Sequence, residues 1–154
     1  MRSLAIVDTS ALYAAVDRAE AKHDQCVEVL GRRDLELVIP TLIVGEATYL
    51  VAARQGPAHE AAFLRGLSSF PIEPPSVDDW PKIADLVERY ADMGLGTADA
   101  SIAVLAERLG TDLVITLDRR HFEAIRTPSG RPFRLLPEWP SIHEEPAAYD
   151  PSPR

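Results

Sequence analysis

The chain has a single cysteine, Cys26, so no disulfide can form within it. A lone cysteine is typical of a reducing compartment, and a free thiol usually packs as a small apolar side chain, which is the role we expect here. Long hydrophobic runs are also missing, since no stretch approaches the ~18–20 apolar residues that span a bilayer. The run from Leu4 to Val7 ends at Asp8 and is too short for the core of a signal peptide. We therefore expect a cytoplasmic protein with no membrane segment.

Positive charge is scarce. The 16 Lys and Arg against 24 Asp and Glu leave a formal net charge of −8. This balance excludes a protein that holds nucleic acid by bulk electrostatic attraction alone. A nuclease remains possible, because a cluster of carboxylates recruits cations and those cations can meet phosphates.

Several catalytic signatures are absent. The sequence contains no G-x-x-x-x-G-K-[ST] or G-x-G-x-x-G loop for nucleotides and no G-x-S-x-G elbow for a nucleophilic serine. Its four histidines have no partners at zinc-ligand spacing. His121 follows Asp118 closely, so it could approach a substrate, although we expect a surface role.

Short apolar segments alternate with longer helical patterns. The expected strands cover 4–7, 35–40, 70–75, 111–118 and 131–137, and the expected helices cover 10–16, 21–32, 42–56, 57–67, 76–94 and 97–110. Thr41 and Thr97 stand where N-caps are expected. Strands that are apolar throughout predict a parallel sheet of four to five strands covered on both faces, an α/β fold. We expect one domain over 1–137 and a disordered, proline-rich tail over 138–154.

Two of the expected strands end on an aspartate: "LAIVD" on Asp8 and "LVITLD" on Asp118. Either residue alone can be a helix cap or a turn residue. In open α/β sheets, however, sites form outside the carboxyl ends of the strands. If both strands are parallel, the two carboxylates lie on the same edge.

Two further acids lie in helical segments. Glu46 has apolar neighbours three and four residues away, so we expect it on an apolar face, where an ionised carboxylate needs a partner or a metal. A solvated Glu46 is the alternative. Asp99 falls in the first turn of its helix, where the helix dipole alone would favour a negative charge. The four acids together fit Mg²⁺ or Mn²⁺, which prefer oxygen ligands and can activate water for phosphodiester hydrolysis.

With these positions, the chain resembles a PIN-domain ribonuclease, specifically a VapC-type toxin of a toxin–antitoxin pair. The resemblance runs from "IVDTSAL" to "TLDRRHF". It matches the four acidic motifs with "DTSAL" for Asp8 and Ser10, the helix of Glu46, "TADASIAVLAERLG" for Asp99, and "VITLDRRHF" for Thr116, Asp118 and Phe122.

The resemblance implies a three-layer α/β/α domain with a parallel sheet in the order 3-2-1-4-5. It implies a Mg²⁺- or Mn²⁺-dependent endoribonuclease that forms a homodimer and is inhibited by an antitoxin whose C-terminal segment enters or covers the acidic site. Asp8, Asp99, Asp118 and Glu46 would be the catalytic metal ligands, Glu46 directly or through water, and Ser10 and Thr116 would orient carboxylates from behind.

Our hypothesis is that a metal-activated water cuts RNA and leaves 5′-phosphate and 3′-hydroxyl ends. Arg119 and Arg120 are placed to meet RNA phosphates, although a solvated turn explains them equally well. One alternative is a non-catalytic PIN-like module that docks a basic peptide in its acidic pocket. A phosphoacceptor domain of receiver type fits less well, because Asp8 is followed by Thr9 rather than a second acid.

Overall fold

Five parallel strands form the centre of the protein, in the order β3-β2-β1-β4-β5. The structure, a computed structural model, describes residues 1–138. The strands are β1 (Ser3–Val7), β2 (Leu35–Pro40), β3 (Ile72–Glu73), β4 (Leu113–Ile115) and β5 (Arg134–Leu136). The predicted strand order is confirmed.

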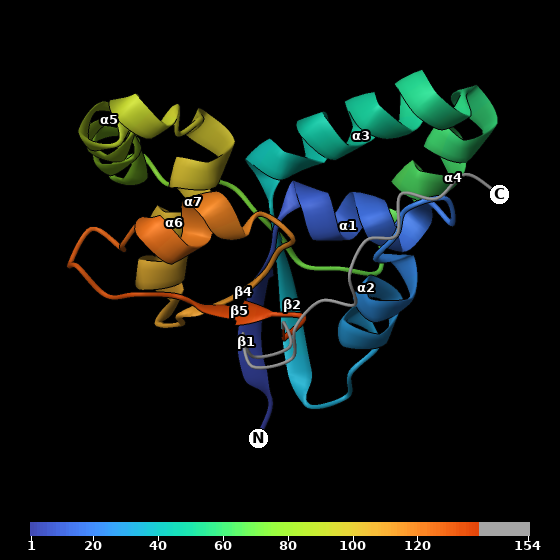
Figure 1. Cartoon of the computed structure of the whole chain (residues 1–154), viewed down its shortest axis with the longest axis horizontal. Helices are drawn as coiled ribbons and strands as arrows, with labels where there is room; N and C mark the ends of the chain where they lie inside the picture. Colours follow the sequence, from blue (N-terminus) through green and yellow to red (C-terminus); the bar gives the residue numbers. More distant parts are fainter. Residues whose placement is uncertain (139–154) are drawn as a thin grey trace, which may run out of the picture.

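Helices flank the sheet in two groups, with α1 to α4 on one side of the strands and α5 to α7 on the other (Figure 1). They are α1 (Thr9–Val16), α2 (His23–Leu30), α3 (Thr41–Gln55), α4 (Pro57–Leu67), α5 (Asp79–Arg89), α6 (Thr97–Leu109) and α7 (Arg119–Ala124), with a 3-10 turn η1 at Ala91–Met93. The predicted three-layer α/β/α fold is confirmed.

The core explains why the buried positions of the central strands are apolar. Ala5, Ile6 and Val7 of β1 are at most 1% exposed, and Val114 and Ile115 of β4 are fully buried. Strands covered by helices on both faces have no solvent side on which polar residues could alternate. Cys26 is also fully buried, as expected for a packing role.

The sheet order places a site at the carboxyl ends of β1 and β4. These strands are neighbours, and the chain leaves β1 towards β2 but returns to β4 from the far edge of the sheet. Connections that diverge in this way leave a crevice at the strand ends, where ligands bind in α/β folds. Asp8 follows β1 directly and lies in this crevice.

Local hydrogen bonds explain why β4 ends earlier than predicted. The peptide N–H of Leu117 donates to Ser10 Oγ at 2.9 Å, and that of Asp118 donates to Thr116 Oγ1 at 2.9 Å. Side chains thus take the donors that would have extended the ladder. The predicted strand over 111–118 is therefore too long, and a helix that the sequence did not predict, α7, begins at Arg119.

The two threonine caps are also wrong. Thr41 and Thr97 are the first helical residues, preceded by Pro40 and Gly96, and neither helix has a side-chain cap. Of the tail predicted over 138–154, only Glu138 lies within the described residues. Within residues 1–138, no helix is both long enough and apolar enough to cross a membrane.

Candidate active site

Asp8 is both a helix cap and a buried acid. It is the N-cap of α1, and its Oδ1 accepts from the peptide N–H of Thr9 at 2.7 Å. Its Oδ2 accepts from the hydroxyls of Ser10 at 2.8 Å and Thr116 at 2.7 Å. Burial to 3% exposure raises the pKa of Asp8, whereas these hydrogen bonds act in the opposite direction. The carboxylate is therefore held in one orientation beside the crevice.

Ser10 and Thr116 connect the two neighbouring strand ends. Each hydroxyl donates to Asp8 and accepts a peptide N–H from the segment after β4, Ser10 from Leu117 and Thr116 from Asp118. Thr116 is fully buried. This is the geometry that the expected supporting role requires, because both hydroxyls fix a carboxylate and the backbone that carries another one.

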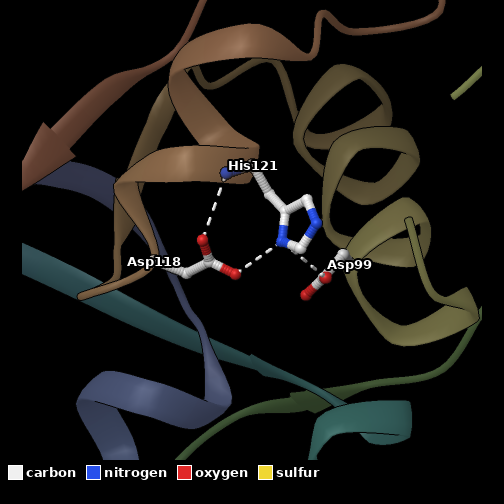
Figure 2. Close-up of side chains that lie close together, drawn as sticks. All are labelled: Asp99, Asp118 and His121. Atoms are coloured by element: carbon white, nitrogen blue, oxygen red, sulfur yellow. Dashed lines mark hydrogen bonds and ion pairs between the residues drawn. The ribbon is translucent and has the colours of Figure 1, made fainter. Parts of the chain in front are cut away.

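Asp118 is the N-cap of α7 and binds His121 twice. Its Oδ1 accepts from the peptide N–H of His121 at 3.1 Å, and its Oδ2 lies 2.7 Å from Nδ1 of the imidazole. Nε2 of the ring lies 3.1 Å from the carbonyl oxygen of Met93. Figure 2 shows the imidazole between the carboxylates of Asp118 and Asp99.

The expected surface position of His121 is therefore wrong. Its side chain is only 17% exposed. A carbonyl oxygen on one ring nitrogen and a carboxylate on the other both favour the protonated ring, and the hydrogen bond to Asp118 is the largest cause of its raised pKa. The missed signal is the spacing: after an N-cap at Asp118, the third residue of the helix faces back towards the cap.

Asp99 is affected by the charges of all three other acids of the site. It lies in the first turn of α6 with a side-chain exposure of 21%. The pKa of Asp99 is raised to about 7, first by burial and then by the charges of Asp8, Asp118 and Glu46, while His121 opposes the shift. The fold thus brings the four predicted acids together.

Glu46 joins the site from outside the core. The inner face of α3 consists of Ile43, Ala47 and Val51, whereas Glu46 is exposed. Glu46 therefore does not lie on the buried apolar face of α3 and is exposed to solvent, as in the alternative. Its Oε2 accepts from the hydroxyl of Thr9 at 3.0 Å, which holds it at the rim next to Asp8.

The two arginines after Asp118 differ. Arg119 is partly buried and donates to the carbonyl oxygen of Pro137, so its guanidinium ties α7 to the end of β5. Arg120 is exposed. The geometry favours Arg120 over Arg119 as a contact for an approaching phosphate.

The residues present fit a divalent cation. Asp99, Asp118 and His121 can each offer one atom such that the three atoms lie within 4.8 Å of one another. Two carboxylates with further acids nearby are the hard oxygen donors that Mg²⁺ and Mn²⁺ prefer. The pKa of Asp99 is raised first by burial and then by repulsion from the neighbouring carboxylates, and a bound cation would relieve that repulsion.

The stability of the metal-free protein is expected to fall as the pH rises from about 5 to 8. Between the ordinary pKa of 3.8 and about 7, folded Asp99 keeps a proton that the unfolded chain has lost, so stability decreases with pH. His121 acts with the same sign, because its raised pKa gives stability that is lost as it deprotonates. Carboxyls with lowered pKa, such as Asp34 beside Arg32, act with the opposite sign but below this range.

Thermal unfolding in EDTA at several pH values measures this dependence. Saturating Mn²⁺ should flatten the curve, since a bound cation favours the ionised carboxylates. A melting temperature in EDTA that is constant or rises between pH 5 and 8 would contradict the electrostatic description of the site.

Known proteins share both the sequence and the fold. Residues 5–127 match the family model of the PIN domain. Ribonuclease VapC26 of Mycobacterium tuberculosis is 39% identical over 134 residues, which cover 86% of this chain and 99% of that relative.

Two solved structures show the same fold at lower identity. VapC20 of M. tuberculosis, described as a toxin that cleaves the sarcin–ricin loop, has a TM-score of 0.68 at 17% identity and covers 75% of this chain and 90% of its own. DNA-bound VapBC of Salmonella typhimurium has a TM-score of 0.62 at 20% identity, with coverages of 88% and 98%. With a family match over most of its length and a close VapC relative, the chain belongs to the PIN-domain family and, within it, to the VapC-type proteins.

Proposed function

We propose that this chain is a Mg²⁺- or Mn²⁺-dependent endoribonuclease and the toxin of a toxin–antitoxin pair. The main support for the proposal is that Asp99 is partly buried next to other acids. The charges of Asp8, Glu46 and Asp118 act on it, and its pKa is raised to about 7. Four acids in one crevice are unfavourable for folding unless they serve a cation. The ribonuclease activity named for the 39% identical relative supports the same function.

Each residue has a distinct part in this proposal. Asp99, Asp118 and Asp8 would hold the cation, with Glu46 directly or through water, and the cation would supply the Lewis acidity that activates water and neutralises charge on the phosphate. Ser10 and Thr116 keep Asp8 oriented, and His121 keeps Asp118 oriented. Water is the nucleophile and the 3′ oxygen leaves, which yields 5′-phosphate and 3′-hydroxyl ends. Arg120, the exposed one of the two arginines after Asp118, would contact the phosphate of the RNA.

The partners follow from the same family. One solved structure of the same fold, from Klebsiella pneumoniae, is described as a toxin–antitoxin complex, and we propose an antitoxin and a homodimer for this chain as well. A groove of about 510 Å³ between α1, α2 and α4, lined by residues such as Leu12, Val27 and Phe63, offers an apolar surface to an amphipathic helix. If an antitoxin helix binds in this groove, the antitoxin residues that follow it could pass over α1 and reach the acids. We propose a cytoplasmic location, where RNA and antitoxin are both present.

Removal of the metal tests the proposal. The purified chain is incubated with a panel of structured and single-stranded RNAs, since proteins recognise stems and loops differently. It should cleave at least one of them in Mg²⁺ or Mn²⁺ and none in EDTA. The products should carry 5′-phosphates, which a ligase-dependent assay detects.

The alternative, a non-catalytic module that docks a basic peptide through its acidic pocket, predicts a different result. It needs neither cleavage nor metal, so calorimetry would detect no heat from Mn²⁺ while a lysine-rich peptide would bind. Cleavage that is equally fast in EDTA would contradict the metal-dependent mechanism.

A further inference from the structure

A hollow on the outer side of α3 lies next to the acidic cluster. Its volume is about 450 Å³, and it is lined by Thr9, Gly45, Glu46, Tyr49 and Leu50. Tyr49 is 72% exposed, which is unusual for so large an aromatic side chain. The hollow and the acidic cluster share residues, since Thr9 donates its peptide N–H to Asp8 and its hydroxyl to Glu46.

The helix geometry places Tyr49 over a bare stretch of backbone. Gly45 and Glu46 precede it by four and three residues, so all three lie on one face of α3. Side chains of a helix lean towards its N-terminus, which directs the ring over the turn that contains Gly45. Because Gly45 has no side chain, nothing from the helix itself fills the space beside the ring.

No internal contact requires glycine at this position. A Cβ built on Gly45 would meet no atom within 4 Å, and its φ is not in the left-handed region. A glycine inside a helix makes that helix less stable than an alanine would. Gly45 therefore lowers the stability of α3, and no internal contact explains why glycine stands there. Its structural effect is that the hollow beside Tyr49 stays open.

The chemistry of the hollow favours an aromatic ligand over an ionic one. Its lining contains no Lys or Arg, and Glu46 would repel a phosphate. The exposed face of a tyrosine ring, in contrast, stacks on a nucleobase without any need for charge. A base beside the acidic cluster would belong to the nucleotide next to the bond that is cut.

We propose that Tyr49 is a stacking platform for one base of single-stranded RNA next to the scissile phosphate, and that Gly45 keeps the space for that base open. The inference rests on the proposed ribonuclease function and gives it a specificity-determining residue. Any base can stack on the tyrosine ring, and the larger purine rings stack more strongly. Tyr49 would therefore position the RNA and bias the choice of cleavage site.

The first test compares KM and kcat on a fluorescein-labelled single-stranded RNA that the wild-type protein cleaves. Tyr49→Ala should raise KM by about 5- to 150-fold, the range that corresponds to stacking of ~1–3 kcal/mol per base, with a much smaller change in kcat. Tyr49→Phe and Tyr49→Trp should remain close to the wild type. An unchanged KM for Tyr49→Ala overturns the proposal, whereas absence of cleavage by the wild type in Mg²⁺ or Mn²⁺ overturns the proposed function instead.

Gly45 gives a matched pair of variants. Gly45→Leu should fill the hollow and raise KM, and yet raise the melting temperature, because leucine is a better helix former than glycine. Gly45→Ala should be stabilised as well, with a KM near that of the wild type. A gain in stability together with a loss of RNA affinity separates occlusion of the hollow from damage to the fold. If Gly45→Leu binds RNA as the wild type does, the hollow is not the base site.

Abasic RNA variants combined with Tyr49→Ala identify the base that stacks on Tyr49. The RNA is prepared with an abasic nucleotide at each position in turn, and its affinity is measured by fluorescence anisotropy in EDTA with the Asp99→Asn protein, which should not cleave it. One abasic position should weaken binding in this protein and have no further effect when Tyr49→Ala is added. Equal losses in both proteins overturn the proposal. So does a change of oligomeric state in sedimentation velocity on Tyr49→Ala, since Tyr49 then belongs to an interface with a second copy.

Discussion

Asp99→Asn is expected to reduce RNA cleavage by about three orders of magnitude while leaving the protein at least as stable as the wild type. Metal ions contribute several kcal/mol to phosphoryl transition states, and each ~1.4 kcal/mol corresponds to a factor of ten in rate. Asparagine has the shape of aspartate but not its charge. Loss of Asp99 therefore removes a ligand from the cluster with Asp118 and His121 without creating a cavity.

The expected gain in stability has an electrostatic cause. The pKa of Asp99 is about 7 because burial and the charges of Asp8, Asp118 and Glu46 all disfavour its ionised form. Above pH 7 the wild-type protein must carry that charge in the absence of metal, whereas the variant does not. In EDTA the melting temperature of the variant should exceed that of the wild type, and the difference should grow between pH 5 and 8.

Asp85→Asn is the matched control. It makes the same change of one charge, on an exposed residue of α5. Cleavage and melting temperature should both remain near the wild-type values, since surface substitutions usually change stability by less than about 0.5 kcal/mol. If Asp99→Asn cleaves RNA at the wild-type rate, Asp99 does not belong to the catalytic centre.

Phe122→Ala is expected to be the most destabilising single substitution near the site, at about 3–5 kcal/mol. The ring is fully buried and packs edge-to-face on Phe133, with centroids 5.9 Å apart and planes at 84°. The helix α7 has six residues, too few to be stable without tertiary packing. Phe122 is its only buried residue, so the truncation should also release the segment that holds Asp118 and His121.

Urea unfolding measures this effect. A loss of ~3–5 kcal/mol is a large part of the ~5–15 kcal/mol by which domains are stable, so the midpoint should fall markedly. Phe122→Leu, which keeps more of the volume, should cost less. Leu64→Ala on α4 serves as the surface control, because Leu64 is 47% exposed. If Phe122→Ala and Leu64→Ala have similar midpoints, the proposed anchoring of α7 is wrong.

Much of the site could be predicted from local sequence. An apolar strand that ends on an acid is visible in "LAIVD" without any structure, and a parallel sheet requires that such ends share one edge. The acid in the first turn of a helix, Asp99, is equally visible. These patterns share a local cause, because the burial of a strand and the start of a helix both depend on residues that are neighbours in sequence.

Other features depend on contacts between distant segments. Glu46 has apolar neighbours in sequence, yet it is exposed, because the inner face of α3 follows the sheet and not the local run of hydrophobic residues. His121 was expected at the surface because α7 was not predicted, and β4 ends before α7 where Ser10, more than a hundred residues away in sequence, accepts the peptide N–H of Leu117.

The sequence by itself therefore determined the alternation of strands and helices, the burial of the central strands and the four candidate acids, two after strands and two in helices. Periodicity and strand-end chemistry are local properties, and they suffice for a fold class and a candidate metal site. Only the tertiary structure decided that Asp8 and Asp118 are linked through Thr116, that His121 rather than solvent faces Asp118, and that Tyr49 stands exposed beside the acids. These features come from residues that meet only when β1, β4 and α3 are packed together.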